Sequence, residues 1–257
     1  MNKGEYMKHM QSNKNEKVKQ WKKLLTKKGR DQSGLFLVEG EHLVYEAKEA
    51  GVIHELIVSE SYYSKLPKSL FSNIETYILA NEIVGTLSDT ETPQGIFATC
   101  KPMKAENIQG ERFLLIDSVQ DPGNVGTMIR TADAVGVDAV IIGEGSVDIY
   151  NPKVLRSAQG SHFHLPIIRG NLEKWIDTLK ENSIPVYGTA LKGAHPMYEV
   201  DGGQPFALIV GNEGQGVNQE LLKKTTKNLY IPIYGKSESL NVSVATGVLL
   251  YYLRGKN

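Results

Sequence analysis

Short, continuous apolar runs in the second half of the chain constrain its fold more than any other feature. They cover residues 113–116, 139–142, 184–190, 207–210 and 229–231. Segments with helical periodicity separate them, for example 125–135 and 172–179. Strands whose side chains do not alternate between apolar and polar are buried on both faces, as in parallel sheets covered by helices. We therefore predict an α/β fold built on a parallel sheet.

The first half of the chain predicts a second, smaller α/β domain. Strand and helix patterns alternate over residues 35–100. Residues 15–27 predict a Lys-rich helix that ends at Lys27-Lys28-Gly29-Arg30, and residues 1–14 lack periodicity and are expected to be disordered. Residues 101–110 form the predicted linker. The two predicted domains are 1–107 and 108–257.

The formal net charge of zero conceals an uneven distribution of charge. Residues 1–30 carry ten Lys or Arg and two Glu, a balance of +8, and the remaining residues carry −8. Such a basic segment is typical of nucleic-acid-binding arms, with a solvated helix face as the alternative. If the segment binds RNA, phosphate contacts are expected from Lys22, Lys23, Lys27, Lys28 and Arg30.

Composition excludes several classes of protein. The single cysteine, Cys100, rules out an intramolecular disulfide and argues against a Cys-based zinc site. No apolar run approaches the roughly 18–20 residues of a membrane span, and the Lys-rich N-terminus lacks the apolar segment of a secretory signal. We expect a soluble, cytoplasmic protein with no metal and no membrane contact.

The first stretch with chemical potential is Asp117–Arg130, DSVQDPGNVGTMIR, directly after a predicted strand. Open parallel sheets bind ligands beyond the carboxyl ends of their strands, which is where this loop lies. Asn124 is placed to cap the following helix. Arg130 lies under two turns further on, either as a functional cation or in an ion pair with Asp133 or Asp117.

The second stretch is Gly211–Val217, GNEGQGV, again directly after an apolar strand. Its glycines run in the reverse of the dinucleotide-binding order, and the acidic residue expected downstream is missing. Gly235-Lys236-Ser237 also lacks the glycine that a Walker A loop needs five residues earlier. Both nucleotide hypotheses fail, which leaves Glu213 as an ionisable group in a tight loop at the edge of the sheet.

The third stretch, NLYIPIYGKSESLNVSVATGVLLYYLR, predicts a strand, a polar loop and a C-terminal helix. Ser237, Ser239 and Asn241 lie where a helix needs side-chain caps for its first N–H groups. A strand, a polar loop and a helix N-terminus can together bind a polar or anionic ligand. The alternative is a buried C-terminal helix with an ordinary cap.

In this order and spacing the three stretches resemble the motifs of the SpoU (TrmH) family of SPOUT-class RNA 2′-O-ribose methyltransferases. The matching segments are DPGNVGTMIRTADAVG, IVGNEGQGV and IPIYGKSESLNVSVATG, within residues 113–253. FLVEGEHLVYEA and TPQGIFA are similar to the family's N-terminal substrate-binding domain. That domain in turn resembles small α/β ribosomal proteins that bind RNA.

The resemblance implies a fold and a cofactor that pattern reading does not supply. Family members bind S-adenosylmethionine in a trefoil knot formed by the C-terminal segment, although knots are nearly absent from proteins in general. Carried over by motif position, the cofactor pocket is expected to be lined by backbone groups of Thr189, Ala190, Leu191, Gly211, Ile231 and Leu240.

The resemblance also implies a reaction, methyl transfer from a sulfonium to a ribose 2′-hydroxyl. Arg130 matches the family's catalytic arginine, with Asn124 and Glu213 in support. Ser239 and Asn241 are expected to orient the substrate or Arg130. Arg130 is either a general base or an electrostatic stabiliser of a phosphate or of the developing alkoxide, and the second role suits a guanidinium that stays protonated.

Family members are homodimers, and the predicted C-terminal helix carries Leu249, Leu250, Tyr251 and Tyr252 around much of its surface. The separate N-terminal domain favours 23S ribosomal RNA as the substrate. A tRNA 2′-O-methyltransferase and a non-catalytic RNA-binding ribosome assembly factor are the alternatives. Because all three motifs follow the linker, the second domain is expected to fold without residues 1–107. The sequence does not identify the methylated nucleotide.

Overall fold

The computed structural model describes residues 8–103 and 108–255, and the chain divides into two compact units. Unit 1 comprises the residues up to Met103 together with Tyr150–Phe163. Unit 2 comprises Lys104–Ile149 and the residues from His164 onward. The chain therefore passes between the units three times. The segment Tyr150–Phe163, which lies inside the second predicted domain in sequence, packs with unit 1.

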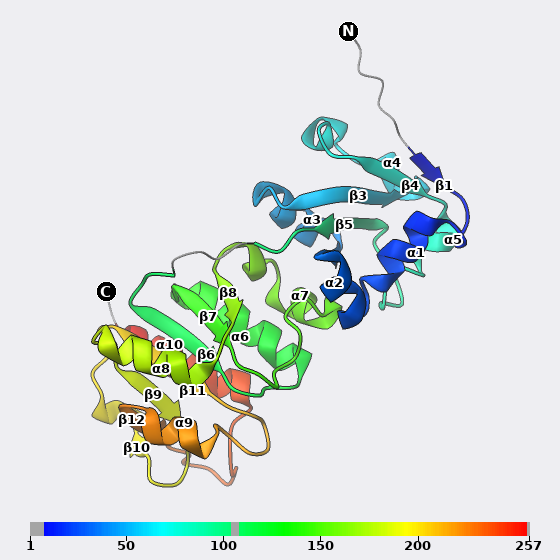
Figure 1. The fold of residues 1–257 in the computed structure, drawn as a ribbon. Coiled ribbons are helices and arrows are strands. Elements are labelled where there is room, and N and C mark those ends of the chain that lie inside the picture. Colours follow the sequence, from blue (N-terminus) through cyan, green and yellow to red (C-terminus); the bar gives the residue numbers. More distant parts are fainter. Residues whose placement is uncertain (1–7, 104–107, 256–257) are drawn as a thin grey trace. The chain divides into compact units, whose positions relative to one another are not determined.

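Unit 1 contains a five-stranded sheet in the order β1-β4-β3-β5-β2 (Figure 1). β5 runs antiparallel to its neighbours β2 and β3, and the other pairs are parallel. The strands are β1 Lys8–Met10, β2 Phe36–Glu39, β3 Ile53–Ser59, β4 Thr76–Leu79 and β5 Ile96–Cys100. The α-helices are α1 Glu16–Lys23, α2 Lys27–Ser33, α3 Glu41–Glu49, α4 Glu60–Tyr63, α5 Asn81–Val84 and α7 Pro152–Ala158.

The start of the chain differs from the sequence-based prediction. Residues 8–14 are not disordered, because β1 pairs with β4; residues 1–7 lie outside the described part. The helix predicted over 15–27 ends at Lys23, and a second helix, α2, begins at Lys27, since Thr26 adopts an extended backbone and accepts the Gly29 N–H to cap it. Gly29 does not end a helix. A Cβ there would lie 2.0 Å from the Lys23 carbonyl oxygen, so glycine lets α2 approach α1 closely.

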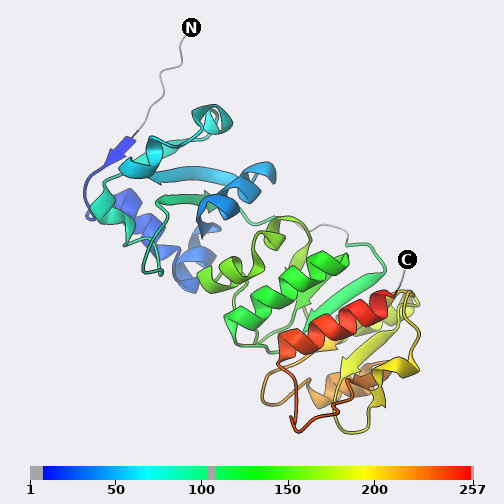
Figure 2. The same ribbon diagram turned by 180° about the vertical axis from the view of Figure 1, so that it is seen from behind.

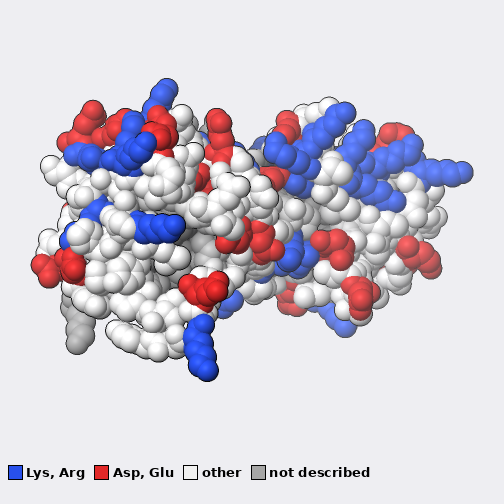
Figure 3. All heavy atoms as spheres, turned by 90° about the horizontal axis from the view of Figure 1, so that it is seen from below, with Lys and Arg blue, Asp and Glu red and all other residues white. Residues whose placement is uncertain are grey.

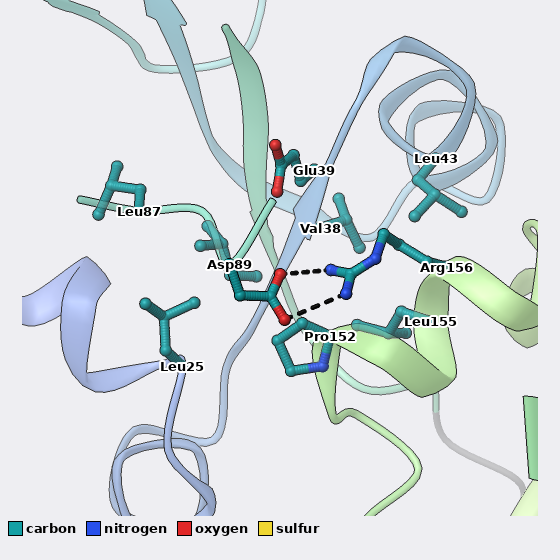
Figure 4. Close-up of a pocket in the computed structure, with 10 residues that line it drawn as sticks. Leu25, Val38, Glu39, Leu43, Leu87, Asp89, Pro152, Leu155 and Arg156 are labelled. Carbon is teal, nitrogen blue, oxygen red and sulfur yellow. Dashed lines mark hydrogen bonds and ion pairs between the residues drawn. The ribbon is translucent and has the colours of Figure 1, made fainter. Parts of the chain in front are cut away.

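The segment Tyr150–Phe163 contributes to the core of unit 1. Leu155 and Phe163 are buried in the cluster that contains Phe36, and the ring of Tyr150 stacks on Phe36 with centroids 4.3 Å apart. Arg156 Nη1 and Nη2 donate to the two carboxylate oxygens of Asp89 at 2.5 and 3.1 Å, beside a shallow hollow (Figure 4). None of the residues lining this hollow belongs to the three motifs. No local pattern in the sequence indicated α7.

Unit 2 contains a seven-stranded sheet in the order β10-β12-β9-β11-β6-β7-β8, and every pairing is parallel. The prediction of a parallel sheet is confirmed. The strands are β6 Arg112–Ile116, β7 Ala139–Ile142, β8 Ile167–Arg169, β9 Val186–Thr189, β10 His195–Pro196, β11 Phe206–Val210 and β12 Lys227–Tyr230. The α-helices are α6 Pro122–Val135, α8 Leu172–Glu181, α9 Gln219–Lys224 and α10 Val242–Arg254.

Helices cover both faces of this sheet, so its central strands are apolar on both sides. α8 and α9 pack on the face shown in front in Figure 1, and α6 and α10 pack together on the opposite face, in front in Figure 2. Every residue of β7 and β11 is buried. Among the described residues no helix is both long and apolar enough to cross a membrane.

The terminal helix α10 has an inner and an outer apolar face. Leu249 and Leu250 were predicted to take part in a dimer contact, but both are buried within the subunit. Tyr252 is half-buried, and its hydroxyl donates to the Val200 carbonyl oxygen at 2.9 Å. Of the four residues predicted to form the dimer face, only Tyr251 is exposed.

Candidate active site

The three motifs meet at one edge of the unit 2 sheet. β12, β9, β11 and β6 are consecutive neighbours in a parallel sheet, so their carboxyl ends lie side by side. The loops that follow β6, β11 and β12 carry the first, second and third motif respectively. Segments more than a hundred residues apart in sequence are therefore brought together at the edge where open α/β sheets bind ligands.

Asn124 was predicted to cap α6, but it does not. Asp121 is the N-cap, and its Oδ1 accepts the backbone N–H of Asn124 at 2.8 Å. Pro122 occupies the first helical turn, where its missing N–H leaves no donor unpaired. Because Asp121 provides the cap, the side-chain amide of Asn124 is available for contacts outside the helix.

The Asn124 side chain joins the three motifs. Its Nδ2 donates to Glu213 Oε1 at 3.1 Å, and its Oδ1 accepts from Asn241 Nδ2 at 3.0 Å. Asn241 Oδ1 accepts the backbone N–H groups of Ser243 and Val244, which makes Asn241 the N-cap of α10. Each amide is oriented by its partners, so the polarity of the chain is fixed. Donation runs from α10 through Asn241 and Asn124 to the Glu213 carboxylate.

Glu213 ends this chain as an anion. Partial burial alone would raise the pKa of its carboxyl. Hydrogen bonds from the Asn124 side chain and from backbone N–H groups, including that of Asp121, outweigh the burial and hold the pKa below its ordinary value. Glu213 is therefore ionised at neutral pH, and its lowered pKa makes it a weak base.

Of the three residues predicted to cap α10, only Asn241 does so. Ser237 Oγ donates to the Ser239 carbonyl oxygen at 2.7 Å, which closes a turn inside the loop. Ser239 is exposed, two residues before the cap. The two serines shape the loop that leads to Asn241.

Arg130 does not form either of the ion pairs considered as alternatives. Asp133 lies 2.8 Å from His164 Nδ1. Asp117 accepts from Ser118 Oγ and from the Asn218 backbone N–H, at 3.0 and 2.8 Å. Arg130 itself is exposed on α6, and the described residues provide it with no hydrogen bond or ion pair. Its guanidinium is available to a substrate.

Two polar side chains that the sequence did not assign to the site, Asp117 and Asn212, connect the first and second motifs. Buried Asp117 binds the backbone of Asn218, and Asn212 Nδ2 donates to the Ser118 carbonyl oxygen at 3.0 Å. Ser118 adopts a left-handed backbone with φ 57°, which is uncommon for a residue other than glycine. The only signal in the sequence was their position after an apolar strand. Asp117 directly follows one strand, and Asn212 lies one residue further beyond another.

The residues expected to line a cofactor pocket lie around the ends of β9, β11 and β12. Gly211 is buried, and a Cβ there would lie 2.1 Å from the Val217 backbone nitrogen. Glycine is thus required by the loop itself. Leu191 and Leu240 are 69% and 40% exposed, which is unusual for leucine and leaves apolar surface that an adenine could cover. Half-buried positions near them are Thr189, Ala190 and Ile231. This chemistry fits a nucleoside cofactor.

The lysines predicted to bind RNA lie on α1 and α2, where Lys and Arg side chains gather on one face of unit 1 (Figure 3). Lys23, Lys27 and Lys28 are exposed and Lys22 is half-exposed. Arg30 differs, because it is 6% exposed and its Nη1 donates to the Leu24 carbonyl oxygen at 2.7 Å. Arg30 stabilises the junction between the two helices and does not face phosphates.

Sequence profiles assign both parts of the chain. The SpoU rRNA Methylase family matches residues 111–251, and the MRM3-like substrate binding domain matches residues 15–98. The chain belongs to the SpoU rRNA methylase family. The family and the class of enzyme predicted from the motifs, an RNA ribose methyltransferase, are confirmed.

Individual relatives agree with this assignment over nearly the full chain. The 23S rRNA (guanosine(2553)-2′-O)-methyltransferase RlmP of Bacillus subtilis is 52% identical over 97% of this chain and 100% of its own. The AdoMet-bound rRNA methyltransferase from Sinorhizobium meliloti matches with a TM-score of 0.86 and 30% identity, covering 96% and 97% of the two chains. AviRb of Streptomyces viridochromogenes, in complex with AdoMet, matches with a TM-score of 0.83 and 28% identity over 93% and 97%.

Proposed function

We propose that this chain transfers a methyl group from S-adenosylmethionine to the 2′-hydroxyl of one ribose in 23S rRNA. The methylated nucleotide is the guanosine of 23S rRNA that corresponds to guanosine 2553, the nucleotide in the name of the Bacillus subtilis relative. That relative is 52% identical to this chain. The observation that carries the proposal is the hydrogen-bonded network from Asn241 through Asn124 to Glu213, together with an exposed Arg130 on α6, the helix that also carries Asn124. It joins all three family motifs at the ligand-binding edge of the sheet.

S-adenosylmethionine is the cofactor of two of the structural neighbours and supplies an activated methyl group on a sulfonium. In this chain the adenine is held by Leu191, Leu240 and Ile231, and the backbone after β9 and β11 approaches the cofactor at Ala190 and Gly211. The C-terminal segment forms a trefoil knot around this pocket. The apolar exposure of Leu191 and Leu240 supports the assignment.

Arg130 acts by electrostatics. A guanidinium remains protonated at every physiological pH, so it is a poor base and a good partner for an anion. Glu213 is held as an anion and is itself a weak base. Arg130 therefore stabilises the developing alkoxide or the phosphate next to the target ribose. Asn124 and Asn241 hold the loops in position, and Ser239 orients the substrate.

The enzyme works as a homodimer through the outer face of α10. Val244, Val248 and Tyr251 are spaced at helical intervals and are 52%, 37% and 60% exposed. A contiguous apolar stripe of this kind marks an interaction surface. A second copy of the chain covers this stripe and brings its own motifs close to the first site.

The exposed lysines of α1 and α2 bind phosphates of the rRNA, and the matched substrate-binding profile over residues 15–98 supports this role. The reaction takes place in the cytoplasm, where such an RNA is available. A tRNA substrate and a non-catalytic assembly role are less well supported, because two relatives whose names give a single substrate, one from Bacillus subtilis and one from Streptomyces viridochromogenes, act on 23S rRNA.

Mapping of 2′-O-methyl groups in 23S rRNA tests the proposal. Ribosomal RNA from cells lacking the gene should lose one modification, and the purified chain with S-adenosylmethionine should restore it on that RNA. An unchanged methylation map in the deleted strain would contradict the proposal, and full restoration by the Arg130→Ala variant would contradict the role given to Arg130. Methylation of tRNA alone would support the alternative substrate.

A further inference from the structure

The loop between β12 and α10 presents an aromatic side chain that the proposed reaction does not yet explain. Tyr234 is 92% exposed, far more than Leu191 at 69% or Tyr251 at 60%. Its hydroxyl has no hydrogen-bond partner within residues 8–103 and 108–255. A tyrosine ring in water forgoes the apolar burial that usually stabilises it, so the ring is available to a ligand.

The ends of this loop are fixed. β12, which precedes it, pairs with β9 in the sheet, and Asn241, which ends it, donates to Asn124 at 3.0 Å. Along the chain Tyr234 lies three residues after Ile231, assigned to the cofactor pocket, and five before Ser239, assigned to the substrate. A ligand that contacts the Tyr234 ring is therefore close to the reacting ribose.

The neighbours of Tyr234 favour RNA over a protein partner. Gly235 and exposed Lys236 follow it, and exposed Glu238 lies two residues further on. Lysine and glutamate are depleted in the cores of protein interfaces. An exposed aromatic ring next to a lysine can stack on a base while the ammonium contacts a phosphate. Single-stranded RNA is commonly recognised by such stacking on unpaired bases.

We propose that Tyr234 stacks on a base of the substrate RNA next to the methylated nucleotide, and that Lys236 contacts the adjoining phosphate. The inference rests on the proposed function of the site and deepens it. Stacking on Tyr234 holds the neighbouring base out of the helical stack, which exposes the target 2′-hydroxyl to the motif loops. Tyr234 thus positions the substrate and takes no part in the chemical step.

Steady-state methylation of a 23S rRNA transcript, with labelled S-adenosylmethionine, tests this role. Tyr234→Ala should raise the KM for RNA about 5- to 150-fold, equivalent to the roughly 1–3 kcal/mol of one base–aromatic stack. Tyr234→Phe should stay close to wild type, because the ring is retained. Tyr198→Ala, at another tyrosine of unit 2 that is 59% exposed, is the matched control and should change nothing.

Three results would overturn the proposal: an unchanged KM in Tyr234→Ala, an equal loss in Tyr234→Phe, or conversion of the dimer to a monomer in sedimentation. The last would identify Tyr234 as a contact between subunits. The affinity of the cofactor, measured by calorimetry, should not move. Filter binding of the same transcript separates the two proposals, because it reports the effect of Tyr234 even if the wild-type chain transfers no methyl group.

Discussion

At the scale of single residues, two asparagines determine how the loops of the proposed active site are held together. Asn241 accepts hydrogen bonds from two backbone N–H groups of α10 and donates one to Asn124. Asn124 in turn donates a hydrogen bond to the Glu213 carboxylate. A series of hydrogen bonds with a fixed direction of donation tolerates few side-chain replacements, since each replacement leaves a polar atom without its partner. It also makes the charge of Glu213 part of the architecture of the site.

The first prediction concerns Asn124→Asp. The new carboxylate would replace the amide that lies 3.1 Å from ionised Glu213, and like charges disfavour ionisation of the pair. The pKa of Glu213, lowered in the wild type, should rise. We expect single-turnover rates at least about tenfold below wild type at pH 8, with partial recovery toward pH 6 as one carboxyl gains a proton that it can donate.

Asn124→Ala is the matched control, because it removes the same amide without adding a charge. Its rate relative to wild type should not depend on pH between 6 and 8, since ionised Glu213 does not titrate there. A ratio for Asn124→Asp that is also independent of pH would show that Glu213 is not coupled to this position.

The second prediction concerns Arg130. Arg130→Ala should lower the single-turnover rate by more than about tenfold, a rise of over ~1.4 kcal/mol in the barrier, because the transition-state charge loses its cation. Arg130→Lys should recover part of the rate by restoring the charge without the guanidinium fork. Calorimetric affinity for S-adenosylmethionine should be unchanged in both. Retention of wild-type turnover in Arg130→Ala would remove the residue from the mechanism.

At the scale of elements, α10 has two apolar faces and a polar N-terminus, each with a different partner. Leu249, Leu250 and Leu253 are buried against the subunit, and the outer stripe of Val244, Val248 and Tyr251 faces away from it. Asn241 at the helix N-terminus belongs to the active-site network. The same short helix therefore supports the fold, the site and the proposed dimer.

The third prediction separates these faces. Val248→Glu should convert the dimer to a monomer in sedimentation at micromolar concentration, because a charge would be buried in an apolar contact. The subunit should stay folded by circular dichroism, since Val248 is not part of its core. Leu249→Ala should instead cost about 2–5 kcal/mol of unfolding free energy. Tyr198→Glu, outside α10, is expected to remain dimeric; a dimeric Val248→Glu protein would locate the interface elsewhere.

At the scale of the whole molecule, the distribution of charge identifies the lysines that are available to bind RNA. Within the basic segment, Lys17, Lys19 and Lys27 each form an ion pair, with Glu55, Glu16 and Asp31 respectively. No carboxylate is paired with Lys22, Lys23 or Lys28 among the described residues. These three lysines are therefore the best candidates for phosphate contacts on α1 and α2.

The fourth prediction is that replacing Lys22, Lys23 and Lys28 together with Ala weakens RNA binding in a salt-dependent way. Each phosphate contact contributes roughly 0.7–0.9 to the slope of log K against log salt, so the slope should fall by about 2–3. Filter binding between 50 and 300 mM salt, roughly the range over which such effects are large, measures it. Lys223→Ala, which removes a lysine paired with Glu220, is the control. An unchanged slope would place the RNA elsewhere.

The fifth prediction revises the expectation that the second domain folds without residues 1–107. α7 follows β7 and precedes β8, two neighbouring strands of the unit 2 sheet, yet Leu155 and Phe163 are buried in the core of unit 1. A protein comprising 108–257 alone would expose these side chains. We expect it to aggregate or to unfold at a lower temperature than the full chain, by light scattering and calorimetry.

The control for this truncation replaces residues 150–163 by a short Gly/Ser linker in the same 108–257 protein. Removal of the exposed apolar surface should restore a monodisperse, folded unit that still binds S-adenosylmethionine. If the simple truncation were already as stable and monodisperse as the full chain, α7 would not depend on unit 1.

The sequence by itself determined the parallel α/β fold, the three motifs and the family, because burial on both faces and close backbone packing leave local signatures. Fully apolar runs identified β6, β7 and β11, and the loop of the second motif requires glycine at Gly211 and Gly216. Helix bounds were predicted well for α8, which was expected over 172–179 and extends over Leu172–Glu181, because one of its faces is strongly apolar.

Only the tertiary structure decided which polar groups meet, because those partners are separated by many residues and leave no periodic signal. Asn124 and Asn241 are 117 residues apart, and Asp117 and Asn218 are 101 apart. Arg30 looked like its neighbouring lysines, but helix packing buried it against a carbonyl group. The placement of α7 in unit 1 likewise depends on long-range burial of Leu155 and Phe163, which no local pattern encodes.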